Sequence, residues 1–148
     1  MSKLFIYYSL SGNGDVVAEA LKQKGYETIK VEPAKQPPKN FFLQMMRCGF
    51  NAGRQYCEPL KDYKADITLF DGIVIGSPVW NGRLSCPINT VLQETDLKGK
   101  KVTFVLYSGS GEAQKAERQI RAAVPDAGII HLRKPKKHTE TLGRLSDL

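Results

Sequence analysis

The chain has 148 residues, of which 41% are hydrophobic and 25% charged, and its formal net charge is +7. These values suit a soluble protein with one core, and we expect residues 1–148 to form a single domain. No apolar run approaches the roughly 20 residues of a membrane span. The N-terminus leads straight into an apolar strand, unlike a signal peptide. We therefore expect a cytoplasmic protein with no membrane span.

The cysteines and histidines give no sign of a metal site. Cys48, Cys57 and Cys86 form no CxxC pair, and His131 and His138 lie far from them in the sequence. Structural sites for zinc usually bring such ligands together at short spacings. We expect free thiols in a reducing compartment and no bound metal.

Positive charge is concentrated between Lys35 and Lys64 and in the run 133–138, RKPKKH. A short basic cluster is usually a solvated face, although it could attract an anionic substrate, the phosphate of a nicotinamide cofactor or an acidic protein. The run has no interleaved aromatic residues and matches no known nucleic-acid-binding pattern. Nucleic acid is therefore not an expected partner.

The first predicted strand, residues 4–8, runs into a loop of hydroxyls and glycines and then into a helix that begins near Gly14 or Asp15. Side-chain donors, inward-turned amides and the positive end of the helix together favour an anion, best a terminal phosphate. The loop contains no Lys or Arg, so neutral dipoles would hold that phosphate. Its residues are Ser9, Leu10, Ser11, Gly12, Asn13 and Gly14.

Two other interpretations of this loop remain open. It could be a tight turn with an ordinary helix N-cap. It could also be a dinucleotide fingerprint, since Gly12 and Gly14 have the right spacing and Glu32 lies near the place of a ribose-binding acid. The third small position of that fingerprint falls on Val17, which would hinder close packing of the helix on the strand. We therefore rank the phosphate-monoester loop first.

The next elements are less regular. Residues 25–31 alternate as a short, edge-like strand, and prolines then open an insertion over residues 33–63. Within it, residues 40–56 are rich in Phe and Met and predict a helix. We favour a helix packed on the edge of the core, with a substrate lid or a dimer surface as alternatives.

The second half repeats the pattern of strand, small-residue loop and helix. Apolar strands are followed by loops of Ser, Gly and Pro, and Pro87 stands in the first turn of the next helix. The predicted strands are 73–75, 101–107 and 128–132, and two further predicted helices are 112–123 and 140–148. The loops are Gly76, Ser77, Pro78, Val79, Trp80, Asn81 and Gly82, and then Ser108, Gly109, Ser110 and Gly111.

Strand and helix alternate along the whole chain, which predicts an α/β, three-layer, doubly wound sandwich. We expect a five-stranded parallel sheet in the order 2-1-3-4-5. Ligands of such sheets bind beyond the carboxyl ends of the strands, where the strand order reverses. The three loops would meet at that point.

These loops resemble those of the flavodoxin family. Residues 9–14, SLSGNG, are similar to its FMN phosphate loop, with Gly14 in place of the usual final Thr. Residues 76–82 resemble the second loop, and Trp80 stands where an aromatic residue flanks the isoalloxazine ring. SGSG resembles the third loop, around the pyrimidine edge of the flavin. The resemblance implies a flavodoxin-like fold with FMN as cofactor. The redox chemistry is then the cofactor's, and we expect no catalytic side chain.

Two departures from electron-carrier flavodoxins guide the expected function. Such carriers are typically acidic and commonly have an aromatic residue in the third loop, whereas this chain is basic and Ser108–Gly111 has none. The resemblance therefore favours an FMN-dependent oxidoreductase that passes electrons from NAD(P)H, or a related donor, to a small acceptor such as a quinone. The alternatives are a one-electron carrier that docks with redox proteins and a non-redox binding module that has lost FMN.

Overall fold

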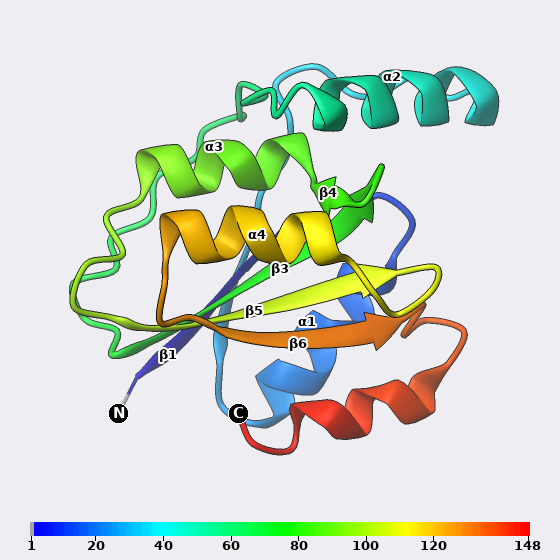
Figure 1. Cartoon of the computed structure of the whole chain (residues 1–148). Helices are drawn as coiled ribbons and strands as arrows, with labels where there is room; N and C mark the ends of the chain where they lie inside the picture. Colours follow the sequence, from blue (N-terminus) through cyan, green and yellow to red (C-terminus); the bar gives the residue numbers. More distant parts are fainter. Residues whose placement is uncertain (1) are drawn as a thin grey trace.

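Parallel strands form the centre of the computed structural model, which describes residues 2–148 (Figure 1). The order in the sheet is β2-β1-β3-β5-β6, and every neighbouring pair on this path is parallel. The flavodoxin-like parallel α/β fold is thereby confirmed. The strands are β1 (Lys3–Tyr7), β2 (Glu27–Lys30), β3 (Gly72–Trp80), β5 (Lys101–Ser108) and β6 (Gly128–Arg133).

The expected count of five strands in the order 2-1-3-4-5 was wrong, because the sheet has six strands in the order 2-1-3-5-6 with β4 (Arg83–Leu84) attached to β3. Strand β3 does not end at Ile75 but continues to Trp80 and pairs antiparallel with β4. Asn81 and Gly82 have φ angles of 51° and 73°. A two-residue hairpin turn of type I′ requires positive φ at both positions. The predicted second loop is therefore largely a hairpin.

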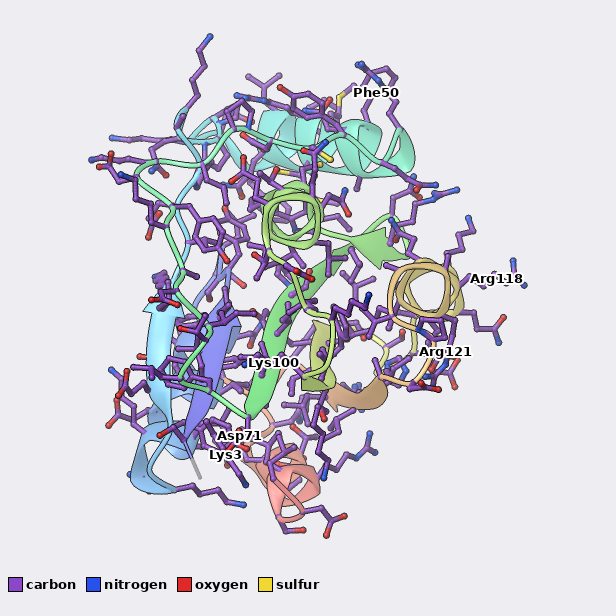
Figure 2. All side chains as sticks on the ribbon, turned by 90° about the vertical axis from the view of Figure 1, so that its left-hand side faces the viewer. Lys3, Phe50, Asp71, Lys100, Arg118 and Arg121 are labelled. Carbon is purple, nitrogen blue, oxygen red and sulfur yellow. The ribbon has the colours of Figure 1, made fainter. Side chains whose placement is uncertain are left out.

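Helices cover both faces of the sheet (Figures 1 and 2). On one face, α3 (Cys86–Glu94) and α4 (Gln114–Ala123) contribute Ile88 and Ile120 to the larger core. On the other face lie α1 (Asn13–Gln23) and η1 (Thr139–Leu145), and their Leu21 and Leu145 belong to the second core. The predicted closing helix 140–148 is thus a short 3-10 helix that ends at Leu145.

Strand β1 separates the two cores. Its side chains alternate, so that Leu4 and Ile6 face α3 and α4 while Phe5 and Tyr7 face α1. The rings of Phe5 and Tyr7 are stacked, with centroids 4.9 Å apart. Gly76 on β3 makes room for this stack, since a Cβ there would lie 2.6 Å from the Phe5 ring. Small residues thus let β1 and β3 approach closely.

Helix α2 (Phe41–Gly53) forms within the 33–63 insertion and lies over α3 (Figure 2). The Asn40 side chain caps it by accepting from the amides of Phe42 and Leu43. The predicted helix is confirmed, but packing on the core edge holds only for its last turns, where Cys48 and Ala52 are buried. Large apolar side chains on the rest of the helix are exposed, namely Phe41, Phe42, Leu43, Met45, Met46 and Phe50. Among residues 2–148, no helix is both long and apolar enough to cross a bilayer.

Candidate functional site

The carboxyl ends of β1, β3 and β5 meet through three aromatic side chains. Tyr8, directly after β1, packs edge-on against Trp80 at the end of β3, with ring centroids 5.7 Å apart at 89°. Tyr107 on β5 donates its hydroxyl hydrogen to the Tyr8 carbonyl. Both tyrosines are buried and Trp80 is half-buried. The three predicted loops contain or directly follow these three aromatic residues.

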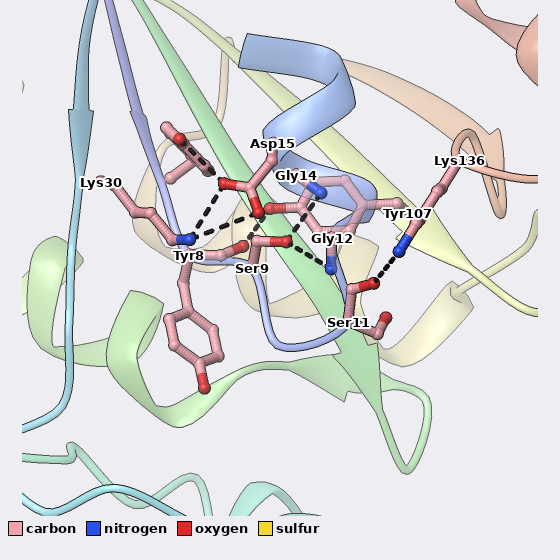
Figure 3. Close-up of polar contacts among 10 residues, drawn as sticks. Tyr8, Ser9, Ser11, Gly12, Gly14, Asp15, Lys30, Tyr107 and Lys136 are labelled. Carbon is pink, nitrogen blue, oxygen red and sulfur yellow. Dashed lines mark hydrogen bonds and ion pairs between the residues drawn. The ribbon is translucent and has the colours of Figure 1, made fainter. Parts of the chain in front are cut away.

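The first loop directs backbone donors at one point (Figure 3). The amides of Gly12 and Gly14 donate to the Ser9 hydroxyl oxygen over 3.1 and 3.0 Å. Gly12, the N-cap of α1, has a φ of 97° and no side chain, and Ser9 instead accepts from the Gly14 amide in the first turn. Since Ser9 holds these two amides, the feature that suits an anion is the positive N-terminus of α1 behind a loop of small polar residues, which makes this loop the candidate for the phosphate of FMN.

Tyr107 explains why Gly14 replaces the usual threonine. A Cβ at position 14 would lie 2.6 Å from the Tyr107 hydroxyl and 2.9 Å from the Ser9 Cβ. The Tyr107 side chain has little freedom to move, because it is buried and its hydroxyl is bonded to the Tyr8 carbonyl. Burial also raises its pKa well above the ordinary value, which keeps the hydroxyl protonated as a donor. The missing loop hydroxyl thus follows from local packing.

The Asp15 carboxylate lies next to this loop, but its negative charge is paired and therefore repels an anion there only weakly. Its carboxylate pairs with the Lys30 amine over 3.0 Å and accepts a hydrogen bond from the Tyr7 hydroxyl over 3.1 Å. Burial, followed by the nearby Asp15 charge, raises the pKa of Tyr7, so this hydroxyl also remains a donor. Lys30 on β2 therefore neutralises the negative charge of Asp15 at the start of α1.

The second predicted loop is held by its own serine. Ser77 is fully buried, its hydroxyl lies 2.9 Å from that of Ser85, and it accepts from the Ser85 amide over 3.1 Å. The Ser77 side chain is thus occupied in fixing the β3–β4 hairpin. Pro78, Val79 and Trp80 are half-buried. The dipeptide Asn81–Gly82 was a hairpin signal that the sequence analysis did not use.

The third loop is closed in a similar way. The Ser108 hydroxyl accepts from the Gly111 amide over 2.8 Å, and the Ser110 hydroxyl accepts from the Glu112 amide over 3.3 Å. Gly109 and Ser110 are exposed. The loop therefore brings small polar groups, and no aromatic ring, to the carboxyl edge of the sheet.

The structure adds a basic turn that the sequence analysis did not place. The Lys136 amide donates to the Asn13 side-chain oxygen over 3.1 Å, and the Lys136 amine donates to the Ser11 carbonyl over 3.4 Å. A shallow hollow is lined by Ser11, Asn13, Lys134, Lys136 and Lys137. The basic run follows the last parallel strand, and parallel strands end at the same edge, so its topological position was a usable signal.

Elsewhere, the molecule has a separate hollow at the opposite edge of the sheet. Lys3, Asp71 and Lys101 line it, and Figure 2 looks at the molecule from this side. None of the three loops contributes to its walls. It is therefore a different feature from the site at the carboxyl edge.

The cysteines lie on and around α2 and α3 and are all free. Burial raises the pKa of the Cys48 thiol to about 11 and that of Cys86 to about 12. Burial also raises the pKa of Glu58, although the Arg47 guanidinium lies 3.7 Å away. Residues 2–148 contain no group of three or more His, Cys, Asp or Glu side chains placed to hold a metal.

Solved structures share this fold. A flavoprotein of Lactobacillus acidophilus in complex with FMN has 20% identity and a TM-score of 0.72, over 94% of this chain and 97% of that chain. A Bacteroides eggerthii protein assigned to the flavoproteins has 21% identity and a TM-score of 0.73, over 94% of both chains. An archaeal flavodoxin has 16% identity and a TM-score of 0.54, over 99% of this chain and 95% of that chain. A search of curated protein sequences finds no match.

The fold and the phosphate loop define a flavodoxin-like, FMN-binding flavoprotein. The sequence model of the NADPH-dependent FMN reductases matches residues 9–136. The chain belongs to this family, and FMN is its cofactor. The matched segment begins at Ser9 in the phosphate loop and ends at Lys136 in the basic turn. The first loop and Lys136 thus both lie within the matched segment.

We expect the contact between Gly14 and Tyr107 to show in stability. Gly14→Ala should lower the free energy of unfolding by about 2 kcal/mol through overpacking, although alanine favours helix. Tyr107→Phe should cost about 1–2 kcal/mol by leaving the Tyr8 carbonyl without its donor. In the double variant the clash is partly relieved, so the loss should be smaller than the sum. Urea unfolding of the four proteins measures this, and strict additivity would contradict the contact.

We expect the thiols to differ in reactivity. At pH 8 a thiol with a pKa of about 11, such as Cys48, is ionised in roughly one molecule in a thousand, and Cys86 less still. Ellman's reagent should therefore modify only the half-buried Cys57 rapidly in the native protein. All three thiols should react in guanidinium chloride. Fast reaction of three thiols without denaturant would show that the region under α2 opens readily.

Proposed function

We propose that the protein is an FMN-dependent oxidoreductase that takes electrons from NAD(P)H and passes them to a small acceptor such as a quinone. The observation that carries the proposal is the third loop, residues 108–111, in which Gly109 and Ser110 are exposed and no residue is aromatic. An uncovered ring face leaves room for a nicotinamide or a flat acceptor to stack. When bound, FMN supplies the hydride and electron transfer.

The chain's own residues bind and orient. In this proposal the first loop and the N-terminus of α1 would hold the phosphate, with the Gly12 and Gly14 amides keeping the loop in shape through Ser9, and Trp80 would form an apolar wall for the ring. The backbones of residues 77–82 and 108–111 would contact its polar edge. Tyr8 packs beside Trp80 and Tyr107 beside Gly14, and both are buried, so they exclude water from the interior next to the site. No side chain in this arrangement acts as a nucleophile or as a general acid or base.

The basic surface supports one other function. With a net charge of +7, the protein could dock with acidic redox partners as a one-electron carrier. The open third loop favours the reductase over this carrier.

We also infer that residues 1–148 form one domain, since the strands join in one sheet. The free cysteines support a cytoplasmic location.

Absorption and fluorescence spectra test the proposed function. Trp80 is the single tryptophan, so binding of FMN beside it should quench the protein's tryptophan emission and saturate at one FMN per chain. When NADPH is then added under anaerobic conditions, the absorbance of the flavin bands should fall without any other reductant. A quinone should restore the bands. Quenching without bleaching, followed by chemical reduction in two separate one-electron steps, would instead indicate the carrier.

We further propose that α2 mediates a homodimer. Phe42, Met46 and Phe50 recur every fourth residue on α2 and are 68%, 57% and 65% exposed. Contiguous apolar surface of this kind marks an interaction site. The stripe itself carries no charge, so two copies of this basic protein could pack there without bringing like charges together. The second copy would cover the surface that α2 leaves exposed.

Replacing two residues of the stripe tests the dimer. Sedimentation of the native protein should give a mass near twice 16.5 kDa at micromolar concentration. Phe42→Lys combined with Met46→Lys should give the monomer, because burying two added charges at the interface is unfavourable. Lys22→Glu on exposed α1 is the control and should leave the mass unchanged. A native protein that is already monomeric at high concentration would contradict the proposal.

A further inference from the structure

The basic turn after β6, residues 134–138, is held in a defined conformation by hydrogen bonds. Lys134 has a φ of 37°, and its carbonyl accepts from the amides of Lys137 and His138 over 2.9 and 2.8 Å. The Lys134 amide donates to the Ser108 carbonyl at the start of the third loop over 3.0 Å. Pro135 is buried and anchors the turn to the body of the protein. These contacts hold the turn next to both the first and the third loop.

Lys136 contacts the first loop at two points, of which the contact with Ser11 is drawn in Figure 3. Its amide donates to the Asn13 side chain, and its amine donates to the Ser11 carbonyl. The amine also lies close to Gly12, where a Cβ would come within 3.2 Å of it. The positive φ of Gly12 favours glycine at this position, and the Lys136 amine lies beside it.

The positive charge of the turn is not cancelled locally. None of the ion pairs found among residues 2–148 includes Lys134, Lys136 or Lys137. The nearest carboxylate of the loop, Asp15, is paired with Lys30 instead. Three ammonium groups without acidic partners create a positive potential beside the loop, which an anion would offset.

We propose that Lys136 is a positioning residue of the flavin phosphate site and that it makes the site selective for phosphorylated flavin. The inference rests on the proposed binding of FMN in this loop. The carbonyl of Ser11 and the amide of Gly12 belong to one planar peptide unit and point in opposite directions. A cation on that carbonyl polarises the Gly12 N–H as a donor to the Ser9 hydroxyl and so helps to fix the shape of the loop in which the phosphate would lie.

Lys136 also supplies a positive charge, which the loop of residues 9–14 lacks. Gly14 supplies no hydroxyl, and residues 9–14 contain no cation. The lysine turn adds positive charge from outside the loop, where Lys134, Lys136 and Lys137 line a hollow together with Ser11 and Asn13, and this charge would attract a phosphate dianion. Riboflavin, which has the same ring but no phosphate, gains nothing from this charge. Lys136 therefore affects one flavin and not the other.

Binding of FMN and riboflavin to two lysine variants tests the inference. Lys136→Met removes the charge and keeps the length of the side chain, while Lys22→Met on exposed α1 makes the same change in net charge far from the loop. Titrations follow the quenching of flavin fluorescence at low and high salt. Lys136→Met should weaken FMN about tenfold at low salt and leave riboflavin unchanged. Lys22→Met should change neither, and Lys136→Arg should restore most of the FMN affinity.

The outcomes separate this inference from the proposed function. Equal FMN affinity in the native protein and Lys136→Met, or equal loss for FMN and riboflavin, would overturn the role of Lys136 and leave FMN binding intact. Native protein that binds neither flavin would overturn both. The salt series adds a readout that a merely structural role would not move, since FMN affinity should fall with salt more steeply in the native protein than in Lys136→Met.

Discussion

The arrangement of the site depends on one buried side chain. Tyr107 reaches from β5 across the end of the sheet, donates to the carbonyl after β1 and occupies the space above Gly14. Its hydroxyl therefore lies directly against the first turn of α1. A larger residue at position 14 is excluded by this contact. The composition of the phosphate loop is thus decided by a residue 93 positions later in the chain.

The parallel sheet brings further segments of the chain next to this contact. Parallel strands all end at the same edge, so the segments that follow β1, β3, β5 and β6 gather there irrespective of their distance in sequence. The loop after β1 supplies converging amides, the β3 hairpin supplies Trp80, and the turn after β6 supplies cations. The first loop has no cation of its own, and the sheet topology provides one.

Much of this could be predicted from the sequence where the signal is local. Apolar runs followed by small-residue loops identify parallel strands, and the run from Ser9 to Gly14 predicts both the turn into α1 and a candidate anion-binding loop. The continuation of β3 to Trp80 could also have been predicted, because Asn81–Gly82 is a local signal for a two-residue hairpin turn.

Other features had no local signal. The contact of Lys136 with Ser11 joins residues 125 positions apart, and only the strand order reveals it. Likewise the Phe and Met residues of α2 have the composition of a core helix, and their exposure is decided by how far the helix extends beyond α3. Composition records which side chains a helix has, whereas tertiary placement decides which of them find a partner.

The two ends of the site are constrained to different degrees, and this difference bears on function. At the proposed phosphate end, Tyr107 packs against Gly14 and Lys136 donates to the Ser11 carbonyl, so the loop is held from two sides. At the proposed ring end, Trp80 is the half-buried aromatic residue, and the third loop satisfies its own serines and leaves Gly109 and Ser110 exposed. A cofactor anchored by its phosphate while one ring face stays accessible suits repeated encounters with separate donors and acceptors. A carrier that exchanges electrons only through the edge of its flavin has no need for that open face, and this asymmetry is the physical reason to favour a reductase.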